Sequence, residues 1–276
     1  MNLPIISLML WPAIACLILP WLLVYLGLHI VRRGVIFVDL ALAQMAAFGT
    51  CVSLVFRYDA HDWQSYVFSL GFTFVGAILL TLTRSKNQKV PQEALIGIVY
   101  VVAAAAAILT LNSSPHGKEE LQQSLVGELL DVTPGEVIKT FGIFTAVGIV
   151  HYIFRKKFLA ISEDPVAAAA SGLNMRRWDL LFYILFGVVV TSFVHLGGVL
   201  LVFTYLVVPA VCASYIGGSA RVRFLIAWGI ATLASVAGVF VAVKADLPIG
   251  AAIVCMLGLV LLGFLIIHKL LRVAMA

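Results

Sequence analysis

The sequence predicts an all-α bundle of about eight or nine membrane-spanning helices, forming a single domain over residues 1–276. Hydrophobic residues make up 63% of the chain and charged residues only 11%, whereas soluble domains carry about 25% charged residues. The mean hydropathy is +1.11, and apolar stretches of roughly 20 residues, long enough to span a bilayer, recur along the chain. No polar stretch between them is long enough to bury a core of its own.

Taken in order, the apolar stretches define nine candidate spans. They cover about residues 4–29, 35–56, 65–83, 92–111, 134–154, 179–195, 197–218, 224–245 and 249–271. Pro12 and Pro20 predict bends in the first span. The seventh span is the least regular, because Gly197, Gly198 and Pro209 permit a broken or re-entrant helix.

The loop charges alternate with these spans. Of the 18 Lys and Arg residues, fourteen fall on one side and four on the other. The fourteen are Arg32, Arg33, Arg84, Lys86, Lys89, Arg155, Lys156, Lys157, Arg176, Arg177, Arg221, Arg223, Lys269 and Arg272; the four are Arg57, Lys118, Lys139 and Lys244. The positive-inside rule makes the first side cytoplasmic, with the N-terminus outside and the C-terminus inside. The net charge of +5 then serves orientation and contact with membrane lipid, and it requires no nucleic-acid partner.

A short stretch on the cytoplasmic side, about residues 162–174, predicts a helix too short to cross a membrane. Asp164 can accept backbone N–H groups at its start, and Pro165 suits the first helical position. A Val/Ala run follows, and Gly172 lets the chain leave the helix. The stretch is either an ordinary loop helix or a contact surface for a soluble partner.

Few polar side chains lie at membrane depth, and each such residue is a functional hypothesis. Asp39 falls six residues after Arg33, roughly 9 Å into the second span, where it either pairs with Arg32 or Arg33 or lies on a translocation path. Gln44 lies about 140° further around the same helix and serves either helix packing or a pore. His195, near the outer surface, is either an interfacial residue or a ligand.

The sequence contains no catalytic motif. It has no phosphate-binding loop, no Gly-x-Ser-x-Gly and no His-Glu-x-x-His. Glu93, one turn inside the fourth span, suits a helix N-terminus. We therefore predict that the chain is not an enzyme and binds no cofactor, and that any ATP used in transport is bound by a partner subunit.

Three sets of residues, in this order and spacing, resemble one family over essentially the whole chain. They are 31–49, then 92–100 with 125–133, and most specifically 163–172 joined to 197–213. The family is the integral-membrane permeases of ABC importers for zinc, manganese and iron, often called the ABC-3 family.

The resemblance implies a multi-pass permease in the bacterial inner (plasma) membrane. Two copies, or two similar permeases, would line one path, with cytoplasmic ABC ATPase subunits below and an extracytoplasmic solute-binding protein above. The short helix would be the coupling helix that contacts the ATPase. The residues expected to make this contact are Glu163, Asp164, Pro165, Ala168 and Gly172.

The chain departs from the family pattern in the second span. Family members usually carry Asp-Ala-Leu-Ser-His where this chain has Leu40-Ala-Leu-Ala-Gln44, and Asp39 lies one position early. We expect Asp39, Gln44 and His195 on the path, with Asp39 and His195 as metal ligands. The expected cargo is a divalent metal ion or its chelate. The alternatives are an importer of a non-metal small molecule, a secondary transporter without ATPase partners, or a membrane scaffold.

Overall fold

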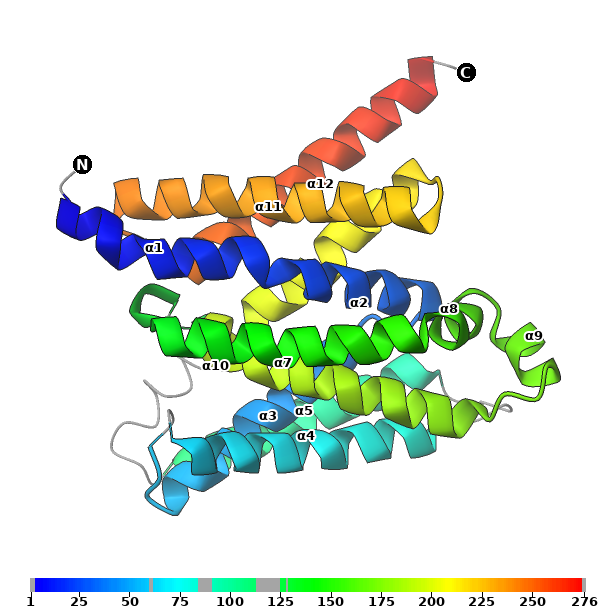
Figure 1. Cartoon of the computed structure of the whole chain (residues 1–276), viewed down its shortest axis with the longest axis horizontal. Coiled ribbons are helices and arrows are strands. Elements are labelled where there is room, and N and C mark those ends of the chain that lie inside the picture. Colours follow the sequence, from blue (N-terminus) through cyan, green and yellow to red (C-terminus); the bar gives the residue numbers. More distant parts are fainter. Residues whose placement is uncertain (1–2, 60–61, 84–90, 113–124, 128, 275–276) are drawn as a thin grey trace.

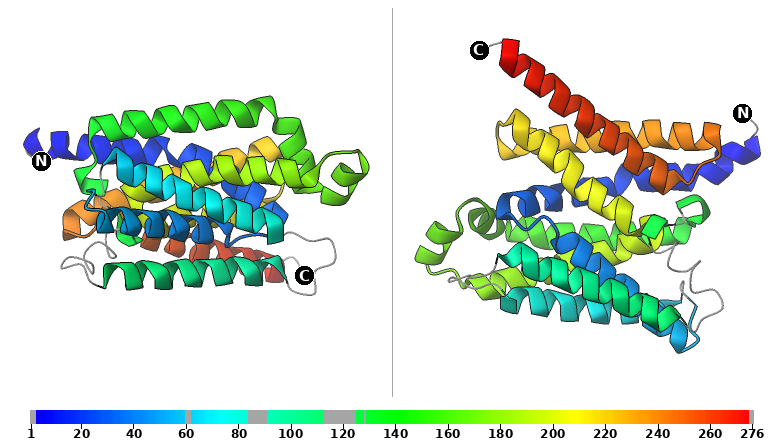
Figure 2. Two further views of the ribbon diagram at one scale, coloured as in Figure 1. Left: turned by 90° about the horizontal axis from the view of Figure 1, so that it is seen from below. Right: turned by 180° about the vertical axis from the view of Figure 1, so that it is seen from behind.

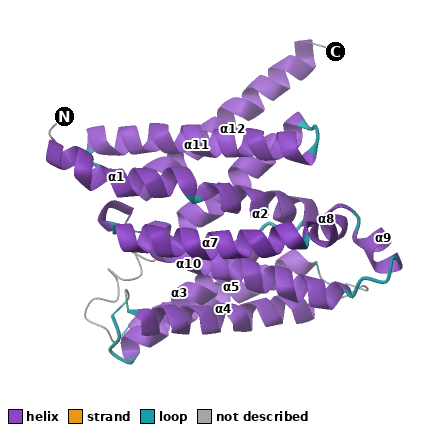
Figure 3. Cartoon of the chain, in the orientation of Figure 1, coloured by secondary structure: helices purple, strands orange, loops and turns teal. Residues whose placement is uncertain are grey.

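The computed structural model describes residues 3–59, 62–83, 91–112, 125–127 and 129–274, and within these ranges all regular structure is helical (Figures 1 and 3). Eight helices are long and apolar enough to cross a membrane. The helices are α1 (Leu3–Ile18), α2 (Pro20–Arg33), α3 (Val38–Val55), α4 (Trp63–Thr83), α5 (Gln92–Leu111), α7 (Pro134–Ile153), α8 (Arg155–Glu163), α9 (Pro165–Ala170), α10 (Met175–Ile216), α11 (Ala220–Ala245) and α12 (Ile249–Ala274), with a 3-10 turn at Leu129–Asp131. The cations Arg84, Lys86, Lys89 and Lys118 lie outside the described residues.

The two termini lie at opposite ends of the bundle (Figure 1). The end at which α2 stops also carries α8 and α9, which project beyond the spanning helices (Figure 1). We call this the inner end, because the loop cations place it in the cytoplasm, and we call the opposite end the outer end.

The first span consists of α1 and α2, which meet at Leu19. The predicted bend at Pro20 is confirmed, because Pro20 begins α2, whereas α1 continues through Pro12. The helix α2 continues to Arg33, four residues beyond the approximate limit of residue 29 expected from the sequence. Cations are favourable in the last turn of a helix, so Arg32 and Arg33 do not end it. Gly34 does, with a left-handed φ of 66°.

The predicted sixth and seventh spans are the two arms of α10. This helix has 42 residues, which would measure about 63 Å if straight, roughly twice the hydrocarbon core. It breaks at Gly198, where φ is 73° and ψ is 167°. Beyond the break, the second arm returns toward the inner end (Figures 1 and 2). Counting the two arms separately, the eight helices supply the nine crossings expected from the sequence.

The centre of the bundle is α10. It contacts α2, α3, α4, α11 and α12. In its most hydrophobic 18-residue stretch, 72% of the residues are buried within the chain, compared with 22% in the corresponding stretches of α5 and α12. The helices α5 and α12 therefore turn most of their apolar residues outward, as expected in lipid.

Candidate functional site

The short helix predicted on the cytoplasmic side is α9, and it begins where the sequence indicates. The Asp164 carboxylate accepts hydrogen bonds from the backbone N–H groups of Val166 at 3.0 Å and Ala167 at 2.9 Å. Pro165 occupies the first helical position, and Gly172 leaves the helix with a φ of 84°. The prediction of a capped helix is confirmed.

A second helix, α8, precedes α9 and was not expected. The sequence predicted a short helix from about residue 162 and assigned no helix to residues 155–161. We call residues 155–174 the coupling segment. Within it Ala168 is only 4% exposed, whereas Val166 is 79% exposed. Val166 is therefore an apolar side chain that α9 leaves exposed, and Ala168 packs inward.

The coupling segment is attached to the bundle by Arg33 at the end of α2. The Arg33 guanidinium donates to the Asp179 carboxylate at 3.0 Å and to the Ser162 hydroxyl at 2.9 Å. It also lies 3.9 Å from the centre of the Phe182 ring. The Arg33 and Asp179 side chains are 3% and 1% exposed. One buried cation thus joins α2, α8 and α10.

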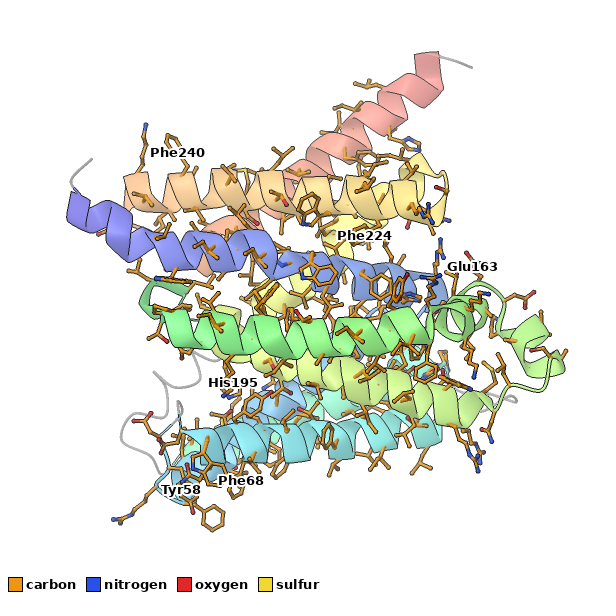
Figure 4. The ribbon with its side chains drawn as sticks, viewed as in Figure 1. Tyr58, Phe68, Glu163, His195, Phe224 and Phe240 are labelled. Atoms are coloured by element: carbon orange, nitrogen blue, oxygen red, sulfur yellow. The ribbon has the colours of Figure 1, made fainter. Side chains whose placement is uncertain are left out.

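A second ion pair lies beside the first. Arg32 donates to Glu163 at 2.9 Å, and the Glu163 side chain is half exposed at the end of α8 (Figure 4). His29 shares a hydrogen bond of 2.9 Å with the Ser162 hydroxyl. Glu163 was expected as a site residue, but His29 and Ser162 were not. Both are polar residues at the ends of apolar stretches, and that position could have marked them as candidates.

Asp39 lies in the first turn of α3, at the inner end, and is 1% exposed. The hypothesis that it pairs with Arg32 or Arg33 is wrong, because these arginines bind Glu163 and Asp179. Among the described residues, no side chain donates a hydrogen bond to the Asp39 carboxylate. The helix dipole is the favourable interaction at this position.

Glu93 lies in the first turn of α5, as predicted, but its carboxylate also reaches the start of another helix. It accepts a hydrogen bond of 2.6 Å from the backbone N–H of Ile36, just before α3. Two carboxyl groups, those of Asp39 and Glu93, therefore lie at the N-terminal end of α3.

A row of hydroxyl groups, which we call the hydroxyl seam, joins α3, α4 and the first arm of α10. The pairs are Thr50 with Ser69 (2.6 Å), Ser53 with Ser65 (2.8 Å), Thr73 with Thr191 (2.8 Å) and Tyr66 with Ser192 (2.7 Å). Hydroxyl pairs of this kind hold spanning helices together. Gln44, on the same α3, is also buried.

The seam ends at His195, near the outer end of the first arm of α10 and three residues before the break at Gly198 (Figure 4). His195 Nδ1 lies 2.8 Å from the Thr191 carbonyl, which can only accept, so Nδ1 carries a proton. In the neutral imidazole this leaves Nε2, 3.5 Å from the Thr50 hydroxyl, with the lone pair. A nitrogen of this kind is a common ligand for transition metals.

His195 also lines a pocket of about 80 Å³, the outer pocket, between α4, α7 and α10. The other polar residues in its lining include Asp62, Tyr66, Glu136 and Lys139. The Lys139 ammonium lies 4.6 Å from the centre of the Tyr66 ring. The pocket thus combines two carboxylates and an imidazole with one cation.

Asp39 and His195, the predicted pair of metal ligands, are not brought together. Thr50, which contacts His195, lies eleven residues after Asp39 on α3, about 16 Å along the helix axis. Across the described ranges, no three His, Cys, Asp or Glu side chains gather closely enough to hold one metal ion. The two residues therefore cannot bind one metal ion together in this conformation.

Comparison with known proteins agrees with this architecture. The family model of the ABC 3 transport family matches residues 5–268. The manganese transport system membrane protein MntC of Halalkalibacterium halodurans is 25% identical over 69% of this chain and 67% of its own length. The manganese import system permease protein ScaB of Streptococcus parasanguinis is 23% identical over 83% of this chain and 79% of its own length.

Among solved structures, PsaBC from Streptococcus pneumoniae in complex with Fab superposes with a TM-score of 0.78 and 21% identity. The match covers 95% of this chain and 90% of that chain, so the fold is shared almost throughout. With its eight apolar helices and these bacterial relatives, the chain is a multi-pass protein of the bacterial inner membrane. The family match over nearly the whole chain leads to one conclusion: it is a transport permease of the ABC 3 transport family.

Proposed function

We propose that the chain is the permease subunit of an ATP-driven importer for a divalent metal ion or its chelate. The observation that carries the proposal is the attachment of the coupling segment to α2 and α10 through Arg33. The manganese import function named for the relatives supports a metal cargo. In this proposal a cytoplasmic ABC ATPase binds the ATP, a solute-binding protein delivers the cargo outside, and a second copy of the chain completes the path.

The contacts of the coupling segment suggest how a push from the ATPase would travel. Val166 is exposed on α9, and α8 connects α9 to the bundle. A displacement of α8 would act on α2 through the Arg32–Glu163 pair and the Arg33–Ser162 hydrogen bond, and Arg33 would pass it to α10 through Asp179. Packed helices with fixed polar contacts move as rigid bodies, so a small shift at α9 would tilt spanning helices.

On the proposed path, cargo meets carboxylates and an imidazole at the outer pocket and a carboxylate at Asp39. Oxygen and nitrogen ligands of this kind suit manganese, iron and zinc. The replacement of the family's span-two ligands by Leu40 and Gln44 is the observation that favours a second candidate, import of a non-metal small molecule. Competition by Mn²⁺, Zn²⁺ and Fe²⁺ in an uptake assay distinguishes the two.

The coupling role predicts a defect in the Asp164→Ala variant. Loss of this cap costs about 1 kcal/mol, so the folded fraction of α9 falls about fivefold relative to its unfolded form. We expect lower permease-stimulated ATP hydrolysis and lower Mn²⁺ uptake by the assembled transporter in proteoliposomes. Ser219→Ala is the matched control, because Ser219 caps α11 at the same end, outside the coupling segment. Normal stimulation in Asp164→Ala, or equal defects in both variants, would refute the role.

The path hypothesis predicts that Asp39→Asn slows uptake about tenfold, the equivalent of 1.4 kcal/mol. Asparagine keeps the shape of the side chain but removes the carboxyl group that could bind a cation. We expect ATP hydrolysis to respond normally to the permease, because Asp39 lies apart from the coupling segment. Asp246→Asn, in the left-handed cap of α11 at the outer end, is the control. Uptake that is unchanged in Asp39→Asn would remove Asp39 from the path.

A further inference from the structure

An apolar groove of about 460 Å³ runs along the surface of the bundle between α2, α7 and α11. Aromatic side chains form much of its lining, among them Trp21, Tyr25, Tyr152 and Phe224 (Figure 4 labels Phe224). Its volume lies within the range of about 300–1,000 Å³ that is typical of ligand pockets. We propose that this groove, the inner groove, binds one acyl chain of an anionic phospholipid whose headgroup lies against Arg155.

The groove exists because α7 has no side chain at Gly148. A Cβ atom built there would lie 3.5 Å from the Trp21 indole, which forms the opposite wall. A methyl group could be accommodated at this distance, but a larger side chain would fill the space. Beside Gly148, Ile149 is 55% exposed and Tyr152 is 67% exposed. The groove is therefore open along one side rather than enclosed.

The position of the groove along the helices matches the inner half of a bilayer. Trp21 lies twelve residues before Arg33, about 18 Å from the inner end of α2. At the other end of the groove, Arg155 opens α8 just beyond α7. The groove thus runs from near mid-membrane to the cytoplasmic surface, where an acyl chain and its headgroup would lie.

The inner rim of the groove is cationic. The Arg155 guanidinium lies 4.3 Å from the centre of the Tyr152 ring, which holds it at the groove. Arg223 precedes Phe224 in α11 and lies close enough to Arg32 to interact with it electrostatically, and its Nε is buried without a hydrogen-bond partner in the described structure. Within the same ranges, no carboxylate lies in salt-bridge distance of Arg155 or Arg223. A phosphate group would supply the missing negative charge.

A polar recess of about 60 Å³ adjoins this rim. It shares Tyr25 and Phe224 with the groove and adds Arg32 and His29. The structure therefore offers an apolar channel for a chain and, at its cytoplasmic end, a polar recess for a headgroup beside the arginines of the rim. Anionic lipids are enriched at such basic sites between spanning helices.

A second copy of the chain is a poorer occupant. In a dimer with its two-fold axis along the membrane normal, the same surface of both copies meets at the same depth. A copy seated on the groove would bring its own Arg155 and Arg223 toward those of the first chain. Like charges would then face each other, whereas a phospholipid headgroup brings the opposite charge.

The test uses the full chain, purified in detergent and mixed with equal amounts of dioleoyl phosphatidylglycerol and dioleoyl phosphatidylcholine. Native mass spectrometry counts the lipids that each chain retains. Each arginine near a membrane surface contributes about a fivefold preference for an anionic headgroup. We expect the wild type to retain one phosphatidylglycerol, Arg155→Gln/Arg223→Gln to lose the preference, and Gly148→Leu to retain neither lipid.

The control variant is Gly142→Leu, which adds the same side chain to another face of α7, where nothing lies within 4 Å. Gly148→Ala, which leaves most of the groove open, should retain lipid and shows whether the site tolerates a side chain. An unchanged preference in the double arginine variant would overturn the proposal. So would equal retention in Gly148→Leu and Gly142→Leu, or efficient disulfide cross-linking of two copies through Thr145→Cys in the groove.

Discussion

Replacing Arg33 with glutamine is expected to lower the free energy of unfolding by about 3–5 kcal/mol, the usual cost of breaking a buried ion pair by removing one partner. The change removes the charge that Asp179, 1% exposed, pairs with, and it also removes a donor to Ser162. Stimulation of the ATPase should fall about tenfold, within the usual range of coupling free energies of about 1–3 kcal/mol. Thermal unfolding in detergent and ATP hydrolysis by the reconstituted complex measure the two effects.

Two further variants separate stability from coupling. Arg33→Met combined with Asp179→Leu replaces the buried pair with apolar side chains and should recover much of the stability. It should not recover ATPase stimulation, because the link to Ser162 on α8 stays broken. Arg32→Gln tests the half-exposed pair with Glu163, and its stability cost should stay below about 1 kcal/mol. Full stimulation in the double variant would show that Arg33 stabilises the fold without transmitting motion.

The second large effect is expected at the break in α10. Gly198→Ala places a side chain on a backbone with a φ of 73° and a ψ of 167°, a region that only glycine occupies readily. The new Cβ would lie 2.5 Å from the backbone N of Gly127 and from the Leu125 carbonyl oxygen. Backbone strain of about 1–3 kcal/mol and overpacking of about 1–3 kcal/mol add to each other. We expect little monodisperse protein after purification.

Gly258→Ala in α12 is the matched control for Gly198→Ala. Nothing lies within 4 Å of the Cβ position at Gly258, and alanine is the better helix former there by about 1 kcal/mol. Its yield and melting temperature should equal or exceed those of the wild type. If Gly198→Ala had the yield and melting temperature of the wild type, the prediction would be wrong, and residues 125–127 would be able to move away from α10 at little cost in free energy.

The sequence was sufficient to predict features that depend on neighbouring residues. The length of the apolar stretches predicted the spans, and Asp164 followed by Pro165 predicted the start of α9. It could not predict which side chains Arg33 would contact, because Ser162 and Asp179 lie 129 and 146 positions away in the sequence. Contacts over that distance depend on how the helices pack, and a single sequence contains no direct signal for this.

The separation of Asp39 from His195 could have been predicted. The alternation of spans already places Asp39 at the inner end of one helix and His195 at the outer end of another. Naming both residues as metal ligands followed from their chemistry alone. Val166 was missed for a different reason. An alanine-rich helix of six residues gives no periodic pattern from which to predict its exposed face.

The hydroxyl seam has a consequence for how the spanning helices move. Its four pairs bond side chain to side chain between α3, α4 and α10. A hydroxyl group that lost its partner in the bilayer would stay unsatisfied, which costs free energy. The seam therefore favours movement of these three helices as one rigid body.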